Sequence, residues 1–464
     1  MPERYPEYWQ EVSSMELSEY LDTVSEQIRC KKARTMVRAE LENHVQEQSD
    51  AYEADGMTPS EAKREAVRQM GDPIGTGTAL NRIHRPHLEW KFLILVLLLS
   101  ALGLALQYMT CYTGLFGGIS GDLADYFWKR QCFFTVTGLG VLAAVYIVDY
   151  TILGRYPLLL WFGYFIVIII IANTHVVIMG KVRIYNYLTL FLPLYAGVLY
   201  RFRTKGYGAV AVCYLLSFMP FFMGLKTIMV HGSLELAGGC FLLLLIAVWK
   251  GFFHVKKART IAALIAVPVL TLLLLYWKGT DLGVLHTYQM IRLQSIFGPD
   301  MLYYNSNGGI IPYLQESVSS FQMFGSSAAP MPKAMKFLNC DYVVFFVFAK
   351  YGIAAGTAML CILAATVVKA FSISWRQKNR LGFLIGTACS VVLTIQMIVY
   401  VAANFGVPLV EPMTIPFLSY GGQSTLVNYI LLGLILSVYR NKDIVSERHG
   451  TRGKWKIRLE RLES

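Results

Sequence analysis

Ten apolar stretches, each long enough to cross a lipid bilayer as a helix, constrain the fold of this chain more than any other feature. They lie near residues 91–110, 132–149, 157–173, 184–200, 207–224, 233–249, 259–277, 342–368, 382–404 and 412–439. Only 16% of the 464 residues are charged, against about 25% in an average soluble protein. The sequence therefore predicts an all-α, polytopic membrane protein with ten transmembrane helices in a domain of residues 89–440. The last stretch contains Pro416 and Gly421-Gly422, which favour irregular, buried backbone in its first half.

Lys and Arg are distributed unevenly between the two ends of these stretches. If the N-terminus is cytoplasmic, four short inner loops hold 12 basic residues and four short outer loops hold 5. This bias, together with the basic tail 441–464, predicts a multi-pass protein of the bacterial plasma membrane with both termini cytoplasmic. The formal net charge of +12 then points to contact with membrane lipids, and nucleic acid is not expected as a partner.

Residues 1–88 are predicted to form a separate, cytoplasmic helical domain. Apolar residues recur at helical spacing over 16–29 and 31–54, and the segment Thr58-Pro59-Ser60-Glu61 has the pattern of a capping box that starts a third helix. That helix is expected to stop near Gly71. Residues 1–90 carry 17 acidic and 11 basic residues, and no catalytic constellation is found among them. The expected role is packing or partner docking.

A 64-residue outer loop, 278–341, separates the seventh and eighth stretches. Connections this long are usually functional, so the loop is expected to cap an outward-facing cavity; the alternative is a solvated connector. It contains the charged residues Arg292, Asp300, Glu316, Lys333 and Lys336, and it ends at Asp341.

Carboxylates at the edge of a bilayer cost free energy unless they are paired or functional. Asp341, Glu235 and Glu411 have such positions, and for Asp341 a functional role is weighed against an interfacial helix cap. Lys350 is the only Lys or Arg away from the ends of a predicted span, and helical geometry places it on the opposite face from Asp341. It is expected to pair with a carboxylate of another span; the alternative is snorkelling.

Three segments resemble the SEDS family (shape, elongation, division and sporulation), whose members include RodA, FtsW and SpoVE. The most specific is Asn404-x-Gly406 followed by Ile415-Pro416-Phe417-Leu418-Ser419-Tyr420-Gly421-Gly422, which is similar to the family's last-span signature. The others are the run from Asp341 to Gly352 and Arg130-Gln131 with Asp149-Tyr150. Together they cover residues 90–440. Residues 15–85 resemble the permease-prefix (HAAS-type) helical domain found ahead of some bacterial membrane proteins.

The SEDS resemblance implies a peptidoglycan glycosyltransferase that polymerises lipid II at the outer membrane face, for shape, division or sporulation. A class B penicillin-binding protein would then crosslink the strands. The resemblance implies that Asp341 is the catalytic residue, either as a base or as the ligand of a divalent cation, Mg or Mn. Candidate substrate contacts are Arg130, Arg292, Lys336, Ser419, Tyr420, Gly421 and Gly422. Further functional candidates are Lys350, Glu235, Glu316 and Asn404.

The chain also departs from the family pattern. The family's His-Thr before the Asp is Asn339-Cys340 here, and its Glu-Glu is Ala349-Lys350, a reversal of charge. These departures favour a divergent member and leave two alternatives open. One is a non-catalytic scaffold or regulator of cell-wall synthesis whose acidic N-terminal domain docks a partner. The other, suggested by Lys350 and the broken last span, is a flippase or transporter of a lipid-linked precursor.

Overall fold

The computed structural model describes residues 15–112, 121–173, 185–220, 230–278, 310–327, 341–407, 414–442 and 444. Its regular elements in these ranges are all helices, which confirms the predicted all-α class. The chain divides into two compact units. One comprises Met1–His87 together with Arg440–Ser464, and the other, which we call the membrane unit, comprises Leu88–Tyr439.

In the described part of the N-terminal unit the helices are α2 (Leu17–Gln27), α3 (Lys31–Ala54), α4 (Pro59–Gln69) and α5 (Pro73–Ile83). Apolar side chains from α2, α3 and α4 form its core. Ile444, from the C-terminal segment of the same unit, is 2% exposed and belongs to this core. The buried members are Tyr20, Val24, Ile28, Ala33, Val37, Val45, Ala66, Val67 and Ile444.

Local sequence signals begin two of these helices. The capping box predicted for α4 is confirmed: the Thr58 hydroxyl donates to Glu61 Oε2 over 2.6 Å, and the Thr58 N–H donates to the same oxygen over 3.4 Å. Helix α5 was not predicted, because Gly75 and Gly77 have low helix propensity. Asp72 caps it by accepting hydrogen bonds from the backbone N–H groups of its first turn. A Cβ at Gly77 would lie 2.8 Å from the Val24 carbonyl oxygen, so this glycine permits close packing of α5 on α2.

Within its described residues, the membrane unit has five helices that are long and apolar enough to cross a bilayer. They are α6 (Trp90–Tyr112), α7 (Gly121–Ile147), α21 (Ile353–Trp375), α22 (Arg380–Asn404) and α23 (Gly422–Arg440). The chain is thus a multi-pass membrane protein, and the number of ten spans stays a prediction. The other helices are α8 (Ile152–Arg155), α9 (Pro157–Asn173), α10 (Tyr185–Leu188), α11 (Phe191–Phe202), α12 (Tyr207–Ser217), α14 (Val230–Trp249), α15 (Lys257–Lys278), α18 (Ile310–Val318) and α20 (Val343–Tyr351).

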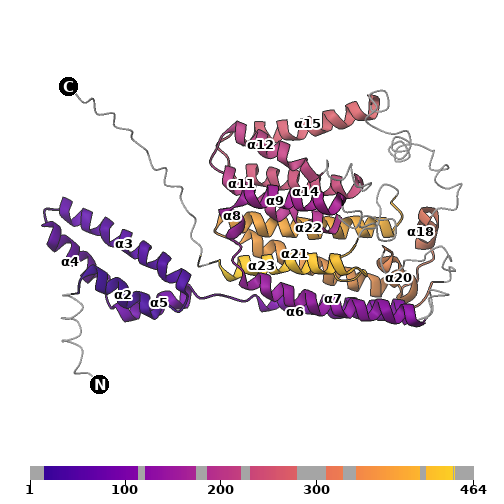
Figure 1. The fold of residues 1–464 in the computed structure, drawn as a ribbon, viewed down its shortest axis with the longest axis horizontal. Helices are drawn as coiled ribbons and strands as arrows, with labels where there is room; N and C mark the ends of the chain where they lie inside the picture. Colours follow the sequence, from indigo (N-terminus) through magenta and orange to yellow (C-terminus); the bar gives the residue numbers. More distant parts are fainter. Residues whose placement is uncertain are drawn as a thin grey trace, which may run out of the picture. The chain divides into compact units, whose positions relative to one another are not determined.

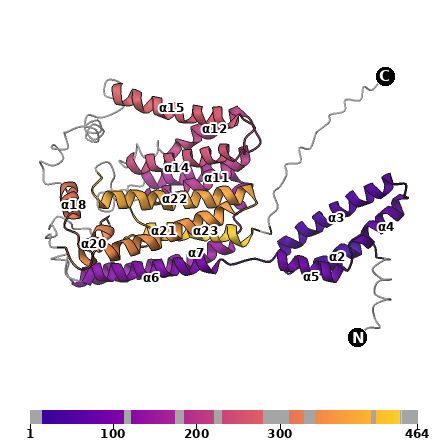
Figure 2. The ribbon, with the colours of Figure 1, turned by 180° about the vertical axis from the view of Figure 1, so that it is seen from behind.

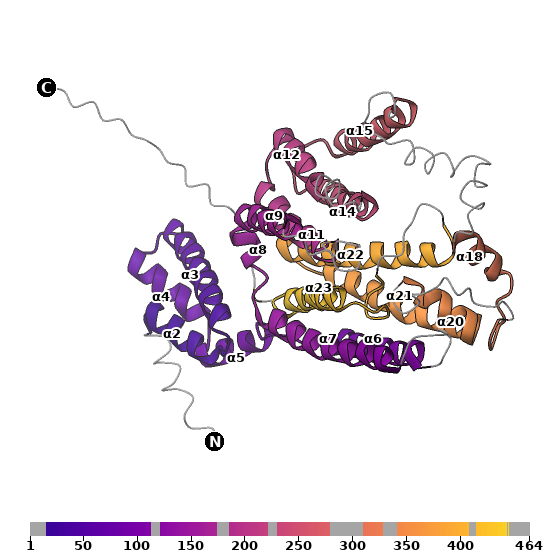
Figure 3. The same cartoon turned by 45° about the vertical axis from the view of Figure 1, so that its right-hand side comes forward.

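Helix α22 is the centre of the membrane unit. It lies between α21 and α23 on one side and α11 and α14 on the other (Figure 1; Figure 2, from behind). Most of its side chains are buried, whereas α15, at the margin beside α12 and α14 (Figure 3), is largely exposed. A helix that is apolar all round and buried all round occupies the core of a bundle. Elements on either face of α22 can therefore be fixed by side chains from one helix.

Two predicted boundaries are wrong. The span predicted over 132–149 begins too late: residues 121–131 form the first turns of α7, because a helix continues past the apolar window into polar sequence. The span predicted over 342–368 ends too early, because α21 extends to Trp375. Within α21, Lys369 pairs with Glu89 at the start of α6, with 2.5 Å between Nζ and Oε1. Because Lys369 is paired with the Glu89 carboxylate, it can lie within a helix of span length.

Candidate functional site

The eighth predicted span, 342–368, is not one helix. Gly352 has φ of +91°, in the left-handed region, and separates the short helix α20 from the span-length helix α21. A Cβ at Gly352 would lie 2.7 Å from the Met323 carbonyl oxygen and 2.9 Å from that of Gln322. The helix therefore breaks because a segment of the loop 278–341 approaches the backbone at a residue where only glycine fits.

The loop segment 320–327 satisfies the backbone groups that this break leaves without helical partners. The N–H groups of Gly325 and Ser327 donate to the carbonyls of Tyr351 and Ala349 at the end of α20, over 3.3 and 2.7 Å. In return, the N–H groups of Ile353 and Ala354 at the start of α21 donate to the carbonyls of Gln322 and Met323, over 2.9 and 3.1 Å. This part of the loop is bonded to the helices and is not a solvated connector.

Helix α18 is also attached to the membrane unit. Leu314 and Ser317 are buried, and Gln315 Nε2 donates to the Gly406 carbonyl just after α22, over 2.8 Å. The Phe321 ring lies 5.6 Å from the Phe345 ring of α20. The prediction that the whole loop caps a cavity also involves residues 279–309 and 328–340, which lie outside the described part of the chain.

Asp341 lies immediately before α20 and is half-buried, and α22 holds the backbone around it. Asn404 Nδ2 donates to the Asp341 carbonyl over 3.0 Å, and Asn404 Oδ1 accepts the Phe345 N–H over 2.9 Å. The Tyr400 hydroxyl accepts the Val343 N–H over 3.0 Å. Asn404 and Tyr400 are both 0% exposed. Two buried side chains of the central helix therefore fix the turn that carries Asp341.

The segment Thr414–Gly421 is irregular backbone buried before α23, as the sequence predicted. Gln107 Nε2 of α6 donates to the Leu418 carbonyl over 2.7 Å, and the Gly421 N–H donates to Gln131 Oε1 of α7 over 3.3 Å. Gly103 permits the approach of α6, because a Cβ there would collide with the Phe417 carbonyl oxygen. Buried amides of the first two membrane helices thus replace the hydrogen bonds that a helix would have supplied.

The four motif residues proposed to contact substrate pack within the protein. Ser419 Oγ accepts the Ile415 N–H over 3.1 Å, and the Tyr420 ring lies 5.0 Å from the Phe127 ring. A Cβ at Gly422 would collide with the Phe134 ring. Their contacts here fix the loop before α23, and their role in substrate binding stays a prediction.

The other candidate residues that the structure describes lie on separate helices. Arg130 is exposed on α7, with its guanidinium 5.6 Å from the Tyr126 ring centre and 5.6 Å from that of Phe134. Glu316 is exposed on α18, and Glu235 is half-buried on α14. Five further residues singled out in the sequence lie outside the described part of the chain: Arg292, Asp300, Lys333, Lys336 and Glu411.

The prediction that Lys350 lies within a spanning helix is wrong. It is half-buried in the last turn of α20, which ends at Gly352. Among the described residues no carboxylate forms an ion pair with it, so the predicted pairing with another span is not found there. A cation in the last turn of a helix interacts favourably with the helix dipole, which accounts for its position.

Sequence reasoning did not assign a role to Gln107, Gln131 or Tyr400. The amides of Gln107 and Gln131 stand out as polar groups in apolar helices, and that signal marks buried hydrogen bonding. Nothing in the sequence shows which backbone groups they meet, because their partners lie some 300 residues away along the chain.

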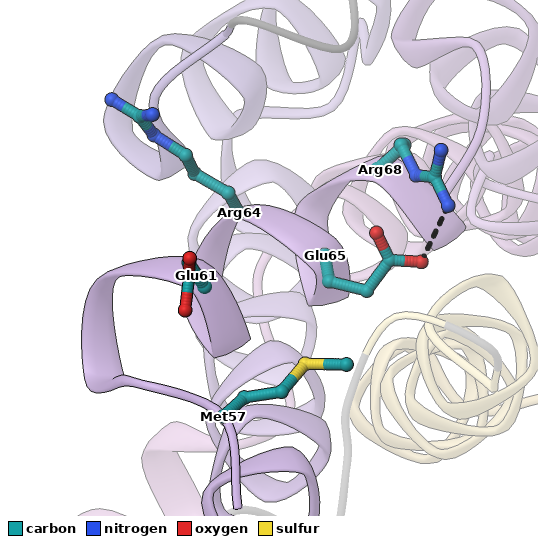
Figure 4. A pocket seen from close by; sticks show the side chains of 5 residues that line it. All are labelled: Met57, Glu61, Arg64, Glu65 and Arg68. Atoms are coloured by element: carbon teal, nitrogen blue, oxygen red, sulfur yellow. Dashed lines mark hydrogen bonds and ion pairs between the residues drawn. The ribbon is translucent and has the colours of Figure 1, made fainter.

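A hollow of about 500 Å³ lies on the N-terminal unit, over α4 and the turn before it. Its lining residues are Met57, Glu61, Arg64, Glu65 and Arg68 (Figure 4). Arg68 pairs with Glu65 over 2.8 Å, and this hydrogen bond and charge lower the pKa of the Glu65 carboxyl. These are alternating charges of one exposed helix face, with no catalytic arrangement.

Comparisons with known proteins agree with this geometry. The family model for FtsW/RodA/SpoVE cell cycle proteins matches residues 240–444. An FtsW from Thioalkalivibrio sp. is 31% identical over 112 residues, which are 23% of this chain and 28% of that protein. The peptidoglycan glycosyltransferase RodA of Mycobacterium tuberculosis is 24% identical over 107 residues, 23% of each chain. The chain thus spans about a quarter of the length of these relatives.

Solved structures share the fold over a longer range. A chain of a peptidoglycan synthase complex, described as coordinating polymerization and crosslinking, matches with a TM-score of 0.61 and 18% identity. The match covers 76% of this chain and 98% of that one. The rod shape determining protein RodA of Thermus thermophilus matches with a TM-score of 0.51 and 15% identity, covering 76% and 97%. Asp341, Asn404 and the motif from Pro416 to Gly422 all lie within residues 240–444, and over this part the chain matches the family model for FtsW/RodA/SpoVE cell cycle proteins.

Proposed function

We propose that this protein is a peptidoglycan glycosyltransferase that polymerises lipid II at the outer face of the bacterial plasma membrane. The observation that carries the proposal is the position of Asp341: a half-buried carboxylate whose backbone is held by Asn404 and Tyr400. It lies in the region matched by the family model, and relatives similar to part of this chain are named peptidoglycan glycosyltransferases.

Glycosyl transfer requires a base for the acceptor hydroxyl and compensation for the charge that develops on the departing pyrophosphate. In our proposal the Asp341 carboxylate accepts the proton of the attacking sugar hydroxyl. Its fixed backbone keeps the carboxylate oriented without reorganisation during the reaction. Arg130, Arg292 and Lys336 are the proposed contacts to phosphate.

A divalent cation, Mg or Mn, is the alternative partner for Asp341. Among the described residues no group of three His, Cys, Asp or Glu is positioned to hold a metal ion. A single carboxylate is nevertheless compatible with Mg²⁺, which commonly binds one or two carboxylates and completes its shell with substrate phosphates and water. Asp341 would hold the ion, and the ion would neutralise pyrophosphate charge. Asp341 is then a ligand and not the base.

The proposed partner is a class B penicillin-binding protein, supported by the likeness of the membrane unit to a chain of a peptidoglycan synthase complex. We further propose that both chain termini are cytoplasmic, on the basis of the Lys and Arg bias. The loop with α18 and the start of α20 then lie on the outer side, where the sugars of lipid II are.

The test is polymerisation of purified lipid II by the full-length protein, with Mg²⁺ or Mn²⁺, in the presence and absence of a class B penicillin-binding protein. Asp341→Asn is expected to lower the rate at least a hundredfold while thermal unfolding stays unchanged. The matched control is Asp122→Asn, the same substitution at an exposed residue in the first turn of α7. Polymerisation by Asp341→Asn at the wild-type rate would remove the assigned role of Asp341.

A second candidate is a non-catalytic scaffold of cell-wall synthesis, favoured by Ala349-Lys350 in place of the family's Glu-Glu. This candidate predicts no polymer from folded wild-type protein under any of these conditions. It also predicts that deletion of residues 1–85 abolishes recruitment of a cytoplasmic partner in cells. A flippase is less well supported, because Lys350 does not lie in a span-length helix.

A further inference from the structure

Three loops meet at one end of the membrane unit, opposite the end that carries α18 and α20 (Figure 1). The α11–α12 and α14–α15 loops are joined through hydrogen bonds. The Thr204 N–H donates to the Phe252 carbonyl over 2.7 Å, and the His254 N–H donates to the Lys205 carbonyl over 2.9 Å. The Lys256 N–H donates to the Tyr207 hydroxyl over 3.1 Å. The two loops are therefore one built surface.

Aromatic rings and cations attach the α21–α22 region to this surface. Lys250 Nζ lies 4.9 Å from the Trp375 ring centre, 5.4 Å from that of Phe383 and 5.5 Å from that of Trp249. The Arg380 guanidinium lies 5.5 Å from the Phe252 ring centre. Contacts of this kind orient the cations beside the aromatic rings.

The surface is strongly basic. Ten Lys and Arg side chains belong to the three loops and the helix ends beside them. They are Arg201, Arg203, Lys205, Lys250, Lys256, Lys257, Arg259, Arg376, Lys378 and Arg380. We call them, with Trp249, Trp375, Phe252 and Phe383, the three-loop surface.

Few carboxylates oppose this charge. Among the described residues of 185–278 and 353–407 the only carboxylate is Glu235, 14 residues before Trp249 on α14, or about 20 Å along the helix. Asp149, beside α8, accepts the Thr151 N–H over 3.0 Å. Among the described residues of these two ranges, the ten cations of the three-loop surface thus stand against one carboxylate.

Apolar surface adjoins the basic residues. Trp249 and Trp375 are 54% and 45% exposed at the ends of α14 and α21. Toward the middle of the unit, Leu242 of α14 and Val368 of α21 are also exposed, at 43% and 67%. Exposed tryptophans at helix ends are typical of the level of lipid headgroups, with acyl chains beside the apolar face. A ligand that combines a phosphate with acyl chains fits both parts.

We propose that the three-loop surface is a binding site for an anionic phospholipid, with the headgroup phosphate near Lys250 and Arg380. The acyl chains lie along the exposed apolar faces of α14 and α21. Each guanidinium or ammonium group that faces anionic lipid contributes to binding. Because aromatic rings already hold Lys250 and Arg380, less side-chain freedom is lost when they bind a phosphate. The site is independent of Asp341 and of the proposed glycosyl transfer.

The experiment measures binding of fluorescent phosphatidylglycerol to the detergent-solubilised full-length protein, with competition by unlabelled lipids. Phosphatidylglycerol is expected to compete at least tenfold better than phosphatidylcholine. The double variant Lys250→Gln/Arg380→Gln is expected to bind phosphatidylglycerol on the order of thirtyfold more weakly. Lys250→Arg should retain binding, since it keeps the charge. The control Lys129→Gln, on α7, should bind as the wild type does.

Several results would overturn the proposal. Equal competition by phosphatidylcholine would remove the anionic specificity, and unchanged binding by the double variant would remove the assigned residues. Competition by inorganic phosphate at millimolar concentration would assign the surface to free phosphate and not to lipid. If the double variant unfolds, Lys256→Gln/Lys257→Gln replaces it, because both side chains are exposed; unchanged binding there would likewise count against the site.

Discussion

The Asn404 amide bridges two positions of the turn that carries Asp341. Its Nδ2 donates to the Asp341 carbonyl over 3.0 Å, and its Oδ1 accepts the Phe345 N–H over 2.9 Å. The same Nδ2 donates to the Tyr400 carbonyl of its own helix over 2.9 Å. One side chain of α22 therefore sets the backbone from which the Asp341 carboxylate extends, and this makes Asn404 a positioning residue for the proposed reaction.

We expect Asn404→Ala to lower kcat for lipid II polymerisation at least tenfold, with KM within about twofold. It should also reduce the free energy of unfolding by about 1–3 kcal/mol, because buried backbone groups lose their partners. Tyr400→Phe is the milder comparison, since it removes only the acceptor for the Val343 N–H. The readouts are steady-state kinetics and thermal unfolding. An Asn404→Ala enzyme that loses stability but keeps kcat would show a purely structural role.

Gly352 supports a second prediction, because Gly325 provides a control with nearly the same backbone conformation. Gly352 has φ of +91° and Gly325 has φ of +87°. A Cβ at Gly352 would lie 2.7 Å from the Met323 carbonyl oxygen, whereas nothing lies within 4 Å of a Cβ at Gly325. We expect Gly325→Ala to cost about 1 kcal/mol and Gly352→Ala about 2–4 kcal/mol in thermal unfolding. Equal losses of stability in the two variants would mean that the loop segment 320–327 does not exclude a Cβ at Gly352.

Local signals were predictable from the sequence, and distant contacts were not. The Thr58 capping box lies within four residues, so its whole pattern can be seen in the sequence. Likewise, Pro416 and Gly421 are residues that disfavour a regular helix where they stand, so the irregular backbone around them was predictable. The break at Gly352 depends on a loop segment some 30 residues earlier, and an apolar run conceals it. The start of α7 was missed because Asp122, Asp125 and Lys129 are typical of a loop in a hydropathy window, although a helix tolerates them outside the apolar region.

For the candidate site, the family resemblance pointed to Asp341 and Asn404 as candidates. It did not predict the hydrogen bond between them, nor the amides that bond to the backbone before α23. Gln107 and Gln131 each bond to backbone near 420, and which carbonyl or N–H they reach depends on how three helices pack. Residue type indicates that a buried amide needs a partner; only the fold supplies the partner's identity.

The Glu89–Lys369 pair predicts a pH dependence of stability. Partial burial raises the pKa of Glu89, but hydrogen bonds from Lys369 and Tyr439 outweigh it and leave the pKa below its usual value. A lowered pKa means that the carboxylate stabilises the folded state above the unfolded pKa of about 4.3 and that this contribution is lost as pH falls through the lower folded value. We expect Glu89→Gln to lower the melting temperature at pH 7 and to approach the wild type near pH 3. Lys369→Gln should behave similarly. A difference that is constant from pH 3 to pH 7 would contradict this pairing.

Ile444 provides the last prediction, because it is the one described residue after Lys442 and it is buried in the core of the N-terminal unit. Its 2% exposure among Val24, Ile28 and Val37 indicates that the C-terminal segment completes a core that α2 to α4 leave open. We expect Ile444→Ala to destabilise this unit by about 2–4 kcal/mol and Ile444→Asp by more, since a charge would be buried without a partner. Hydrogen exchange of the α2 and α3 amides in the full-length protein should accelerate by about two orders of magnitude, while α22 is unaffected. Ile83→Ala is the control, because Ile83 is 55% exposed on α5. Unchanged exchange in Ile444→Asp would show that the four helices form their core without the C-terminal segment.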